Sequence, residues 1–169
     1  MGPRSGDRRL YLEPGLQARG QNDRRMDKRP SPATGHRVVP HTADLIIEAW
    51  APTRIECVEE AVRALVDAFA RVAEGAVTEP FAVELEQDGD EALLVSLLEE
   101  VIYVIDVLGG IPANVVLHET EDGRVAGSID VAPAGAVVIH GSLPKGVSLS
   151  DLSFTHDRVQ WRCRATIDV

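Results

Sequence analysis

Residues 45–75 read LIIEAWAPTRIECVEEAVRALVDAFARVAEG and predict a strand followed directly by a helix. The first six, 45–50, are rich in branched and aromatic side chains, which favour an extended strand. Thr53 and Glu56 have the spacing of a capping box, in which the hydroxyl accepts from a backbone N–H and the carboxylate reaches back to the cap. Apolar residues then recur at intervals of three or four, which predicts one buried helical stripe that Gly75 ends: Ile55, Val58, Val62, Leu65, Val66, Phe69 and Val72.

The remaining sequence predicts a second helix among several short strands. Residues 90–108 carry a wide apolar face with Glu99, Glu100 and Asp106 opposite it, and Gly109 follows as a helix stop. Segments with alternating or branched apolar residues predict strands at 37–41, 45–50, 81–85, 115–118, 125–129, 137–140, 147–154 and 159–167. Strands joined by short turns pair in antiparallel fashion, so we expect an α+β fold with two helices packed on a mostly antiparallel β-sheet in two layers.

The chain divides into a short tail and one domain. With 169 residues, of which 44% are hydrophobic, it is long enough for one well-buried core. Residues 1–35 are rich in Arg, Gly, Pro and Asp, so burial cannot offset the entropy of ordering them. We therefore expect a disordered basic N-terminal tail over 1–35 and a folded domain over 36–169. Translation from Met26 is an alternative that would remove most of the basic excess, and mass spectrometry of the native N-terminus tests it.

Charge is divided unevenly between these two parts. Residues 1–35 contain eight Lys or Arg and four Asp or Glu; of the totals of 17 and 27, nine and 23 therefore remain for residues 36–169. The folded part thus carries a net charge of −14, which repels a phosphate backbone. We expect no direct nucleic-acid binding by it, so that any role in RNA metabolism would run through a protein partner.

The sequence indicates a cytoplasmic protein without a membrane segment. Cys57 and Cys163 lack the CxxC spacing of zinc ribbons and redox motifs, and nothing indicates the oxidising compartment that a disulfide between them would need. The opening MGPRSGDRRLYLEPG lacks the apolar core of a signal peptide. The longest apolar stretch, 93–108, is interrupted by three acidic residues and is therefore not predicted to span a membrane.

Asp44 and Asp168 are the candidates for chemistry in a sequence without a P-loop, GxGxxG, GxSxG or HExxH motif. Each lies at the border of a predicted strand, where the backbone is ordered and solvent is close. If the sheet brings them together, the two carboxylates must share a proton or a hard cation such as calcium or magnesium. A free carboxylate on Val169 would add a third oxygen ligand if the natural protein ends there. From the residues alone it is equally open that Asp44 caps a turn and that Asp168 is merely solvated.

Two further residues have both a functional and a structural interpretation. His41 and Asp44 could form a transition-metal pair, but two ligands three residues apart outside a helix are weak evidence, and a hydrogen-bonded structural His41 is favoured. Lys145 is an isolated positive charge just before a predicted strand, and an ordinary solvated lysine is the favoured interpretation from the residues alone.

Three separated motifs of the folded part resemble the archease family. The first is the HTAD segment, His41 to Asp44, which an apolar strand and a capped helix follow. The second is DEALLVSLLEEVIY at 90–103, which is similar to the family's DE-x-LLV-x-x-L-x-E-x-x-Y run. The third is the ending from Ile167 to Val169, an aspartate followed by one aliphatic residue. The motifs occur in the family's order, and the resemblance covers residues 36–169.

This resemblance implies a function that the residues alone do not. It implies an accessory protein that helps an RtcB-type RNA ligase form its guanylylated histidine and turn over repeatedly, in tRNA splicing or RNA repair. It also implies a calcium site at Asp44 and Asp168, with the terminal residue Val169 contributing. The family's functional lysine, in a VKAxTY segment, corresponds to Lys145. Within that segment this chain has Gly146, Ser148 and Leu149 in place of Ala, Thr and Tyr.

Two other function classes compete with this expectation. A hydrolase could use Asp44 and Asp168 as an acid/base pair, but the sequence offers it neither a nucleophile motif nor a poised histidine. A general chaperone or interaction module would need no metal, and a chelator would not affect its suppression of client aggregation. We therefore expect a protein that is not itself an enzyme, with calcium or another hard divalent cation as cofactor and an RtcB-type ligase as partner.

Overall fold

The computed structural model describes residues 33–85 and 88–169. The predicted tail therefore lies outside the described residues except for 33–35, and Gly35 already begins the first strand. The described helices are α1 (Arg54–Asp67), α2 (Asp90–Asp106) and the short 3₁₀ turn η1 (Ala134–Ala136). The described strands are β1 (Gly35–Pro40), β2 (Asp44–Ala51), β3 (Ala70–Val72), β4 (Glu79–Leu85), β5 (Gly110–Glu119), β6 (Val125–Pro133), β7 (Val137–Ile139), β8 (Gly146–His156) and β9 (Trp161–Asp168).

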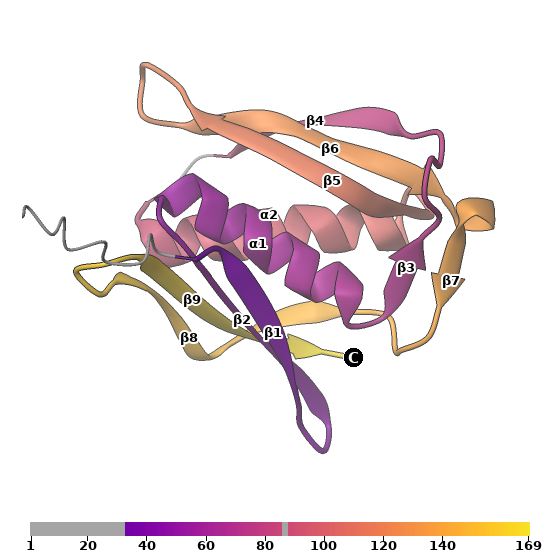
Figure 1. Ribbon diagram of the computed structural model, residues 1–169, viewed down its shortest axis with the longest axis horizontal. Coiled ribbons are helices and arrows are strands. Elements are labelled where there is room, and N and C mark those ends of the chain that lie inside the picture. Colours follow the sequence, from indigo (N-terminus) through magenta and orange to yellow (C-terminus); the bar gives the residue numbers. More distant parts are fainter. Residues whose placement is uncertain (1–32, 86–87) are drawn as a thin grey trace, which may run out of the picture.

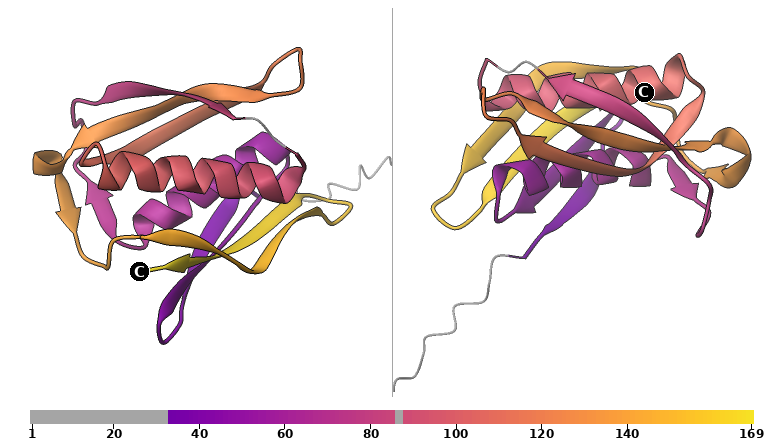
Figure 2. Two further views of the ribbon diagram at one scale, coloured as in Figure 1. Left: turned by 180° about the vertical axis from the view of Figure 1, so that it is seen from behind. Right: turned by 90° about the horizontal axis from the view of Figure 1, so that it is seen from above.

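The strands form a four-stranded sheet, a three-stranded sheet and a two-stranded ribbon, and their pairing is antiparallel throughout. The four-stranded sheet has the order β1-β2-β9-β8, the three-stranded sheet has the order β4-β6-β5, and β3 pairs with β7. Figure 1 shows α1 and α2 lying between the two larger sheets. Figure 2 shows the same arrangement from behind and from above, with the β3–β7 ribbon at one end of the helices.

This architecture confirms the predicted α+β class with two helices and antiparallel strands, but the layering differs from the expected two layers. The helices are covered on both sides, because α2 contacts β8 of one sheet and both β4 and β5 of the other. The apolar face of α2 is wide enough for this, since eight of its side chains are buried: Leu93, Leu94, Leu97, Leu98, Val101, Ile102, Val104 and Ile105. The core therefore lies around the helices. Neither helix of the described residues is long and apolar enough to cross a bilayer.

Helix α1 begins as the sequence predicts but ends earlier. The capping box is present, because the Glu56 N–H donates to Thr53 Oγ1 at 3.2 Å and the Thr53 N–H donates to Glu56 Oε2 at 3.2 Å. The helix ends at Asp67, so the prediction that it continues to Gly75 is wrong. The chain turns at the buried Phe69, whose carbonyl accepts from the His140 N–H at 2.8 Å, and residues 70–72 then pair with β7. The three-residue spacing of Phe69 and Val72 continues the helical pattern, but pairing with β7 makes this segment a strand.

The four-stranded sheet has one face on the helices and one without helices. Alternate residues of β9, Cys163, Ala165 and Ile167, are buried, as the sequence predicts. The residues between them, which include Arg162, Arg164 and Asp168, belong to the opposite, helix-free face. The two cysteines are free thiols in the core. The neighbouring Cys57 thiol and burial raise the pKa of Cys163 far above its usual range, which keeps it protonated.

Candidate functional site

Asp44 and Asp168 lie directly opposite each other in the structure. Asp44 begins β2 and Asp168 ends β9, and the antiparallel register pairs the two residues. Side chains at directly opposed positions of an antiparallel pair have Cβ atoms about 4.5–5.5 Å apart. Both residues lie on the helix-free face, where Asp168 is exposed and Asp44 is half-buried. The structure therefore brings together two carboxylates that are 124 positions apart in the sequence.

The side-chain oxygens of both aspartates are unused within the part of the chain that the structure describes. Neither carboxylate makes a hydrogen bond or ion pair with another residue of 33–85 or 88–169. Asp44 therefore does not cap the β1–β2 turn, which was the structural alternative for that residue. His41, which lies in the same turn, is exposed and has no hydrogen bond to a described residue, so the prediction of a hydrogen-bonded structural histidine is wrong.

The segment around Lys145 completes this end of the sheet. The Lys145 backbone N–H donates to the Asp168 carbonyl at 2.8 Å, and Gly146 pairs with Asp168 across β8 and β9. A Cβ atom added at Gly146 would lie 3.7 Å from Asp168 Oδ2, which is an ordinary van der Waals distance. The glycine that departs from the family segment is thus compatible with the same backbone path. Val169 is half-buried against the core and holds the end of β9 in position.

The carboxylate oxygens of Asp44 and Asp168 suit a hard cation, but they are too few to complete its coordination sphere. Two unused carboxylates side by side repel, and a cation between them would remove that repulsion. Calcium takes six to eight oxygen ligands. Within residues 33–85 and 88–169, no three side chains of His, Cys, Asp or Glu come together as a metal site. The remaining ligands would have to come from backbone carbonyls such as that of Val169, from water or from a partner.

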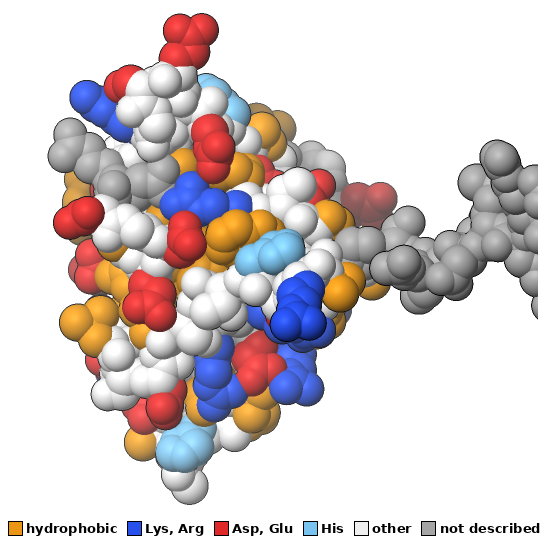
Figure 3. Space-filling model, turned by 90° about the vertical axis from the view of Figure 1, so that its left-hand side faces the viewer, with side chains coloured by type: hydrophobic (Ala, Val, Ile, Leu, Met, Phe, Trp, Pro, Cys, Tyr) orange, Lys and Arg blue, Asp and Glu red, His pale blue; other side chains and the backbone are white. Residues whose placement is uncertain are grey.

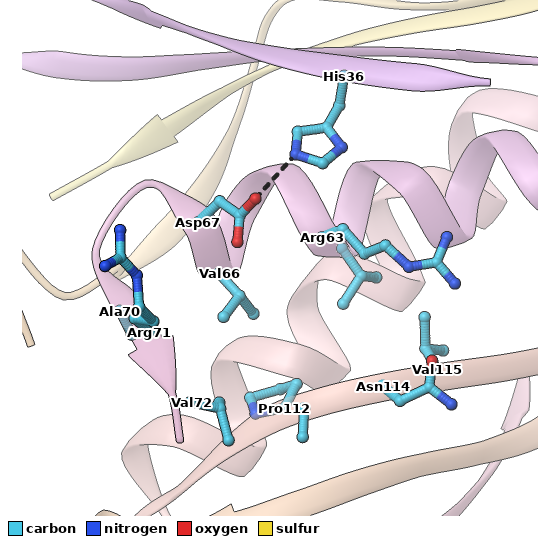
Figure 4. Close-up of a pocket in the computed structure, with 12 residues that line it drawn as sticks. His36, Arg63, Val66, Asp67, Ala70, Arg71, Val72, Pro112, Asn114 and Val115 are labelled. Carbon is cyan, nitrogen blue, oxygen red and sulfur yellow. Dashed lines mark hydrogen bonds and ion pairs between the residues drawn. The ribbon is translucent and has the colours of Figure 1, made fainter. Parts of the chain in front are cut away.

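A second cluster, around His36, lies outside the predicted site. Figure 4 shows His36 above a cavity of about 290 Å³ that α1, β3 and β5 line. His36 Nδ1 lies 2.8 Å from Glu60 Oε2, and His36 Nε2 lies 3.0 Å from Asp67 Oδ2. The buried Glu60 also accepts from Arg63, so all of its contacts are local to this cluster. The histidine therefore links the edge strand β1 to α1, a structural role for which the sequence carries no signal.

Comparison with known proteins identifies relatives of this chain. The Archease protein family (MTH1598/TM1083) matches residues 36–169. The "Probable protein archease" of Mycobacterium tuberculosis strain CDC 1551 / Oshkosh is 43% identical over 141 residues, which cover 83% of this chain and 78% of that protein. The protein of the same name from strain ATCC 25618 / H37Rv has the same identity and coverage.

Two solved structures resemble the fold. Protein 1598 of Methanobacterium thermoautotrophicum has a TM-score of 0.59 and 19% identity, and the match covers 80% of this chain and 99% of that chain. An archease from Thermotoga maritima, described as a possible chaperone, has a TM-score of 0.58 and 18% identity, with 78% and 94% covered. At these identities the likeness concerns the fold alone.

Proposed function

Because the chain belongs to the archease family, we propose that it is a non-catalytic accessory protein that activates an RtcB-type RNA ligase in tRNA splicing or RNA repair. The observation that carries this proposal is the in-register pair of Asp44 and Asp168, whose carboxylates are unused within the described residues. The family resemblance assigns its functional aspartates to the same two positions. Lys145, the third such residue, is exposed next to the pair.

The proposed cofactor is calcium or another hard divalent cation. Asp44 and Asp168 would hold it, with a backbone oxygen of Val169 contributing. When bound, the ion would supply a fixed positive charge between the two strands. Since the side chains of residues 33–85 and 88–169 provide too few ligands on their own, a group from the partner would complete the coordination sphere. Metal binding and partner binding would then be coupled.

The mechanism that follows relies on this chain's own residues for docking and orientation. An acidic domain approaching a basic ligase cleft is attracted over a long range, and complementary charge sets the rate and register of docking. The backbone bond from Lys145 to Asp168 keeps the lysine next to the carboxylate pair as it docks. By binding one geometry of the ligase better than others, the accessory protein would shift the ligase towards its guanylylation-competent state.

The test compares ligase turnover with wild-type protein, Asp44→Ala and Asp168→Ala. We expect each variant to lose about tenfold or more of the stimulation, because each removes one of the two carboxylates. Glu121→Ala is the matched control, since it also removes one exposed negative charge but lies in the distant β5–β6 turn. Undiminished stimulation by both aspartate variants would contradict the proposal.

A general chaperone is the alternative, and exposed apolar side chains favour it. Val77, Leu149 and Val138 are 84%, 73% and 67% exposed. Such residues can bind unfolded clients. Suppression of aggregation of unrelated proteins, unaffected by a chelator or by either aspartate variant, would support this function over ligase activation.

A further inference from the structure

The helix-free face of the four-stranded sheet carries a cluster of arginines, here called the arginine face and consisting of Arg37, Arg162 and Arg164. They line a hollow of about 540 Å³ together with Glu48, Trp50, Ser153 and Thr155. The three guanidinium side chains are 65%, 54% and 36% exposed, respectively. Figure 3 shows basic side chains gathered around an acidic one in the lower half of the view, whereas acidic side chains dominate its left edge.

Two carboxylates hold the arginines in position without using up their donors. Glu48 accepts from Arg37 Nε and Arg164 Nη1, and Asp157 accepts from Arg162 Nε at 2.6 Å. The bond from Arg37 lowers the pKa of Glu48, so it is ionised at neutral pH. A guanidinium group has five N–H donors. Each arginine therefore keeps several donors that no described residue accepts.

The local charge of this face is opposite to that of the domain. Three arginines against Glu48 and Asp157 leave one excess positive charge, although residues 36–169 as a whole have a net charge of −14. Arg37 and Arg164 are neighbours only because β1 and β9 both pair with β2 at Glu48. A count of charges along the sequence therefore hides this surface.

We infer that the arginine face binds the backbone phosphates of a single-stranded RNA. Guanidinium forks match phosphate oxygens, and a helix-free sheet face that combines arginines with an aromatic ring is a recurrent platform for single strands. The aromatic ring here is Trp50, and the absence of a side chain at Gly35 makes room for it, since a Cβ there would lie 2.9 Å from Trp50 Cζ2. The hydroxyls of Ser153 and Thr155 add neutral donors, which a site for acidic peptides does not require.

The position of this face relates it to the carboxylate pair. Arg164 and Asp168 lie on the same side of β9, four residues or about 13 Å apart. An RNA strand on the arginines would extend towards Asp44 and Asp168. A role in presenting the RNA end to a ligase rests on the proposed function, whereas the binding of RNA itself does not.

The test is a fluorescence-anisotropy titration of a fluorescein-labelled oligouridine of about 20 nucleotides with the full chain, at low salt and without ligase. We expect Arg164→Gln and Arg37→Gln each to weaken binding about tenfold and to reduce the slope of log affinity against log salt concentration by about 0.7 per lost contact. Arg71→Gln is the matched control, because Arg71 is exposed on β3, outside the four-stranded sheet, and its loss changes net charge equally. The affinity of Arg71→Gln for the oligouridine should stay within twofold of the wild-type affinity.

Residues 1–32 are basic and present in every variant, so their contribution cancels in the comparison. Equal affinity of all four proteins, or no binding by the wild type, would overturn the inference. Tighter binding of an oligoglutamate of equal charge, lost in Arg164→Gln, would also overturn it in favour of an acidic protein segment. Because Arg37 is on an edge strand, Arg37→Gln still provides the test if Arg164→Gln fails to fold. Ligase stimulation is measured in a separate assay. A protein that does not stimulate the ligase could therefore still bind RNA, and the two outcomes are distinguishable.

Discussion

Gly127 lies in β6 between β4 and β5, where another side chain would not fit. A Cβ there would lie 2.0 Å from the Val116 carbonyl oxygen and 2.9 Å from Leu117 Cα. Because backbone atoms of a paired strand cannot move aside easily, we expect Gly127→Ala to lower the free energy of unfolding by about 3 kcal/mol. Urea denaturation measures this. Gly135→Ala is the control, since its Cβ would meet nothing within 4 Å, and its effect should stay within about 0.5 kcal/mol.

Asp157 makes the β8–β9 turn sensitive to acid. Its carboxylate accepts from Arg162 Nε and from the backbone N–H groups of Gln160 and Val159, and these bonds lower its pKa from 3.8 to about 2. A carboxyl whose pKa is lower in the folded state adds stability above its unfolded pKa, and this stability is lost as the pH falls through the folded value.

We therefore expect Asp157→Asn to unfold at a lower temperature than wild type at pH 7, and we expect the difference to shrink between about pH 4 and pH 2. Thermal unfolding followed by circular dichroism across that range provides the measurement. Asp106→Asn serves as the control, because Asp106 is exposed and has no partner among the described residues. A difference in unfolding temperature that grows as the pH falls would contradict a lowered pKa of Asp157 in the folded state.

At the scale of one element, the N-terminus of α1 depends on its capping box. Thr53→Ala removes the hydroxyl that accepts from the Glu56 N–H and donates to Glu56 Oε2, and it leaves only the backbone N–H bond to the Glu56 carboxylate. We expect a loss of about 1 kcal/mol in the free energy of unfolding, measured with urea. Thr34→Ala, which changes an exposed threonine ahead of β1, should have little effect. Equal stability of both variants would mean that packing alone holds this helix end.

Most elements were predictable from local pattern, because alternation and helical periodicity reflect burial of one face. The capping box, α2 and the alternating faces of β9 are examples. The end of α1 was not predictable. Phe69 and Val72 continue the helical spacing, yet the hydrogen bond from His140 to the Phe69 carbonyl depends on a segment about 70 residues further on. No local signal distinguishes helix from strand there.

At the scale of the whole molecule, the candidate site was only half predictable. The positions of Asp44 and Asp168 at strand borders could be read from sequence, but their direct opposition depends on the β2–β9 register. The arginine face was also not predictable from sequence, since Arg37 and Arg164 lie together only because both donate to Glu48. Both sites depend on the order of strands in a sheet, which sequence pattern does not specify.

Calcium should stabilise the whole domain if the carboxylate pair holds it. A ligand at 100 times its dissociation constant adds about 2.7 kcal/mol, which for a domain of this size corresponds to a rise of roughly 5–10 °C in Tm. We expect this rise for wild type and for Glu121→Ala, and its loss in Asp168→Ala and after addition of a chelator. Differential scanning calorimetry provides the measurement. An equal rise in Asp168→Ala would mean that the ion binds elsewhere.

The strand order β1-β2-β9-β8 has a consequence during translation. Strand β9 is made after β1, β2 and β8, yet it occupies an interior position between β2 and β8. A nascent chain still attached to the ribosome before residue 168 emerges has an open gap in this sheet and only one of the two paired aspartates. The strand that closes the sheet thus also brings the second carboxylate, so incompletely synthesised molecules should lack the proposed site and be vulnerable to proteolysis.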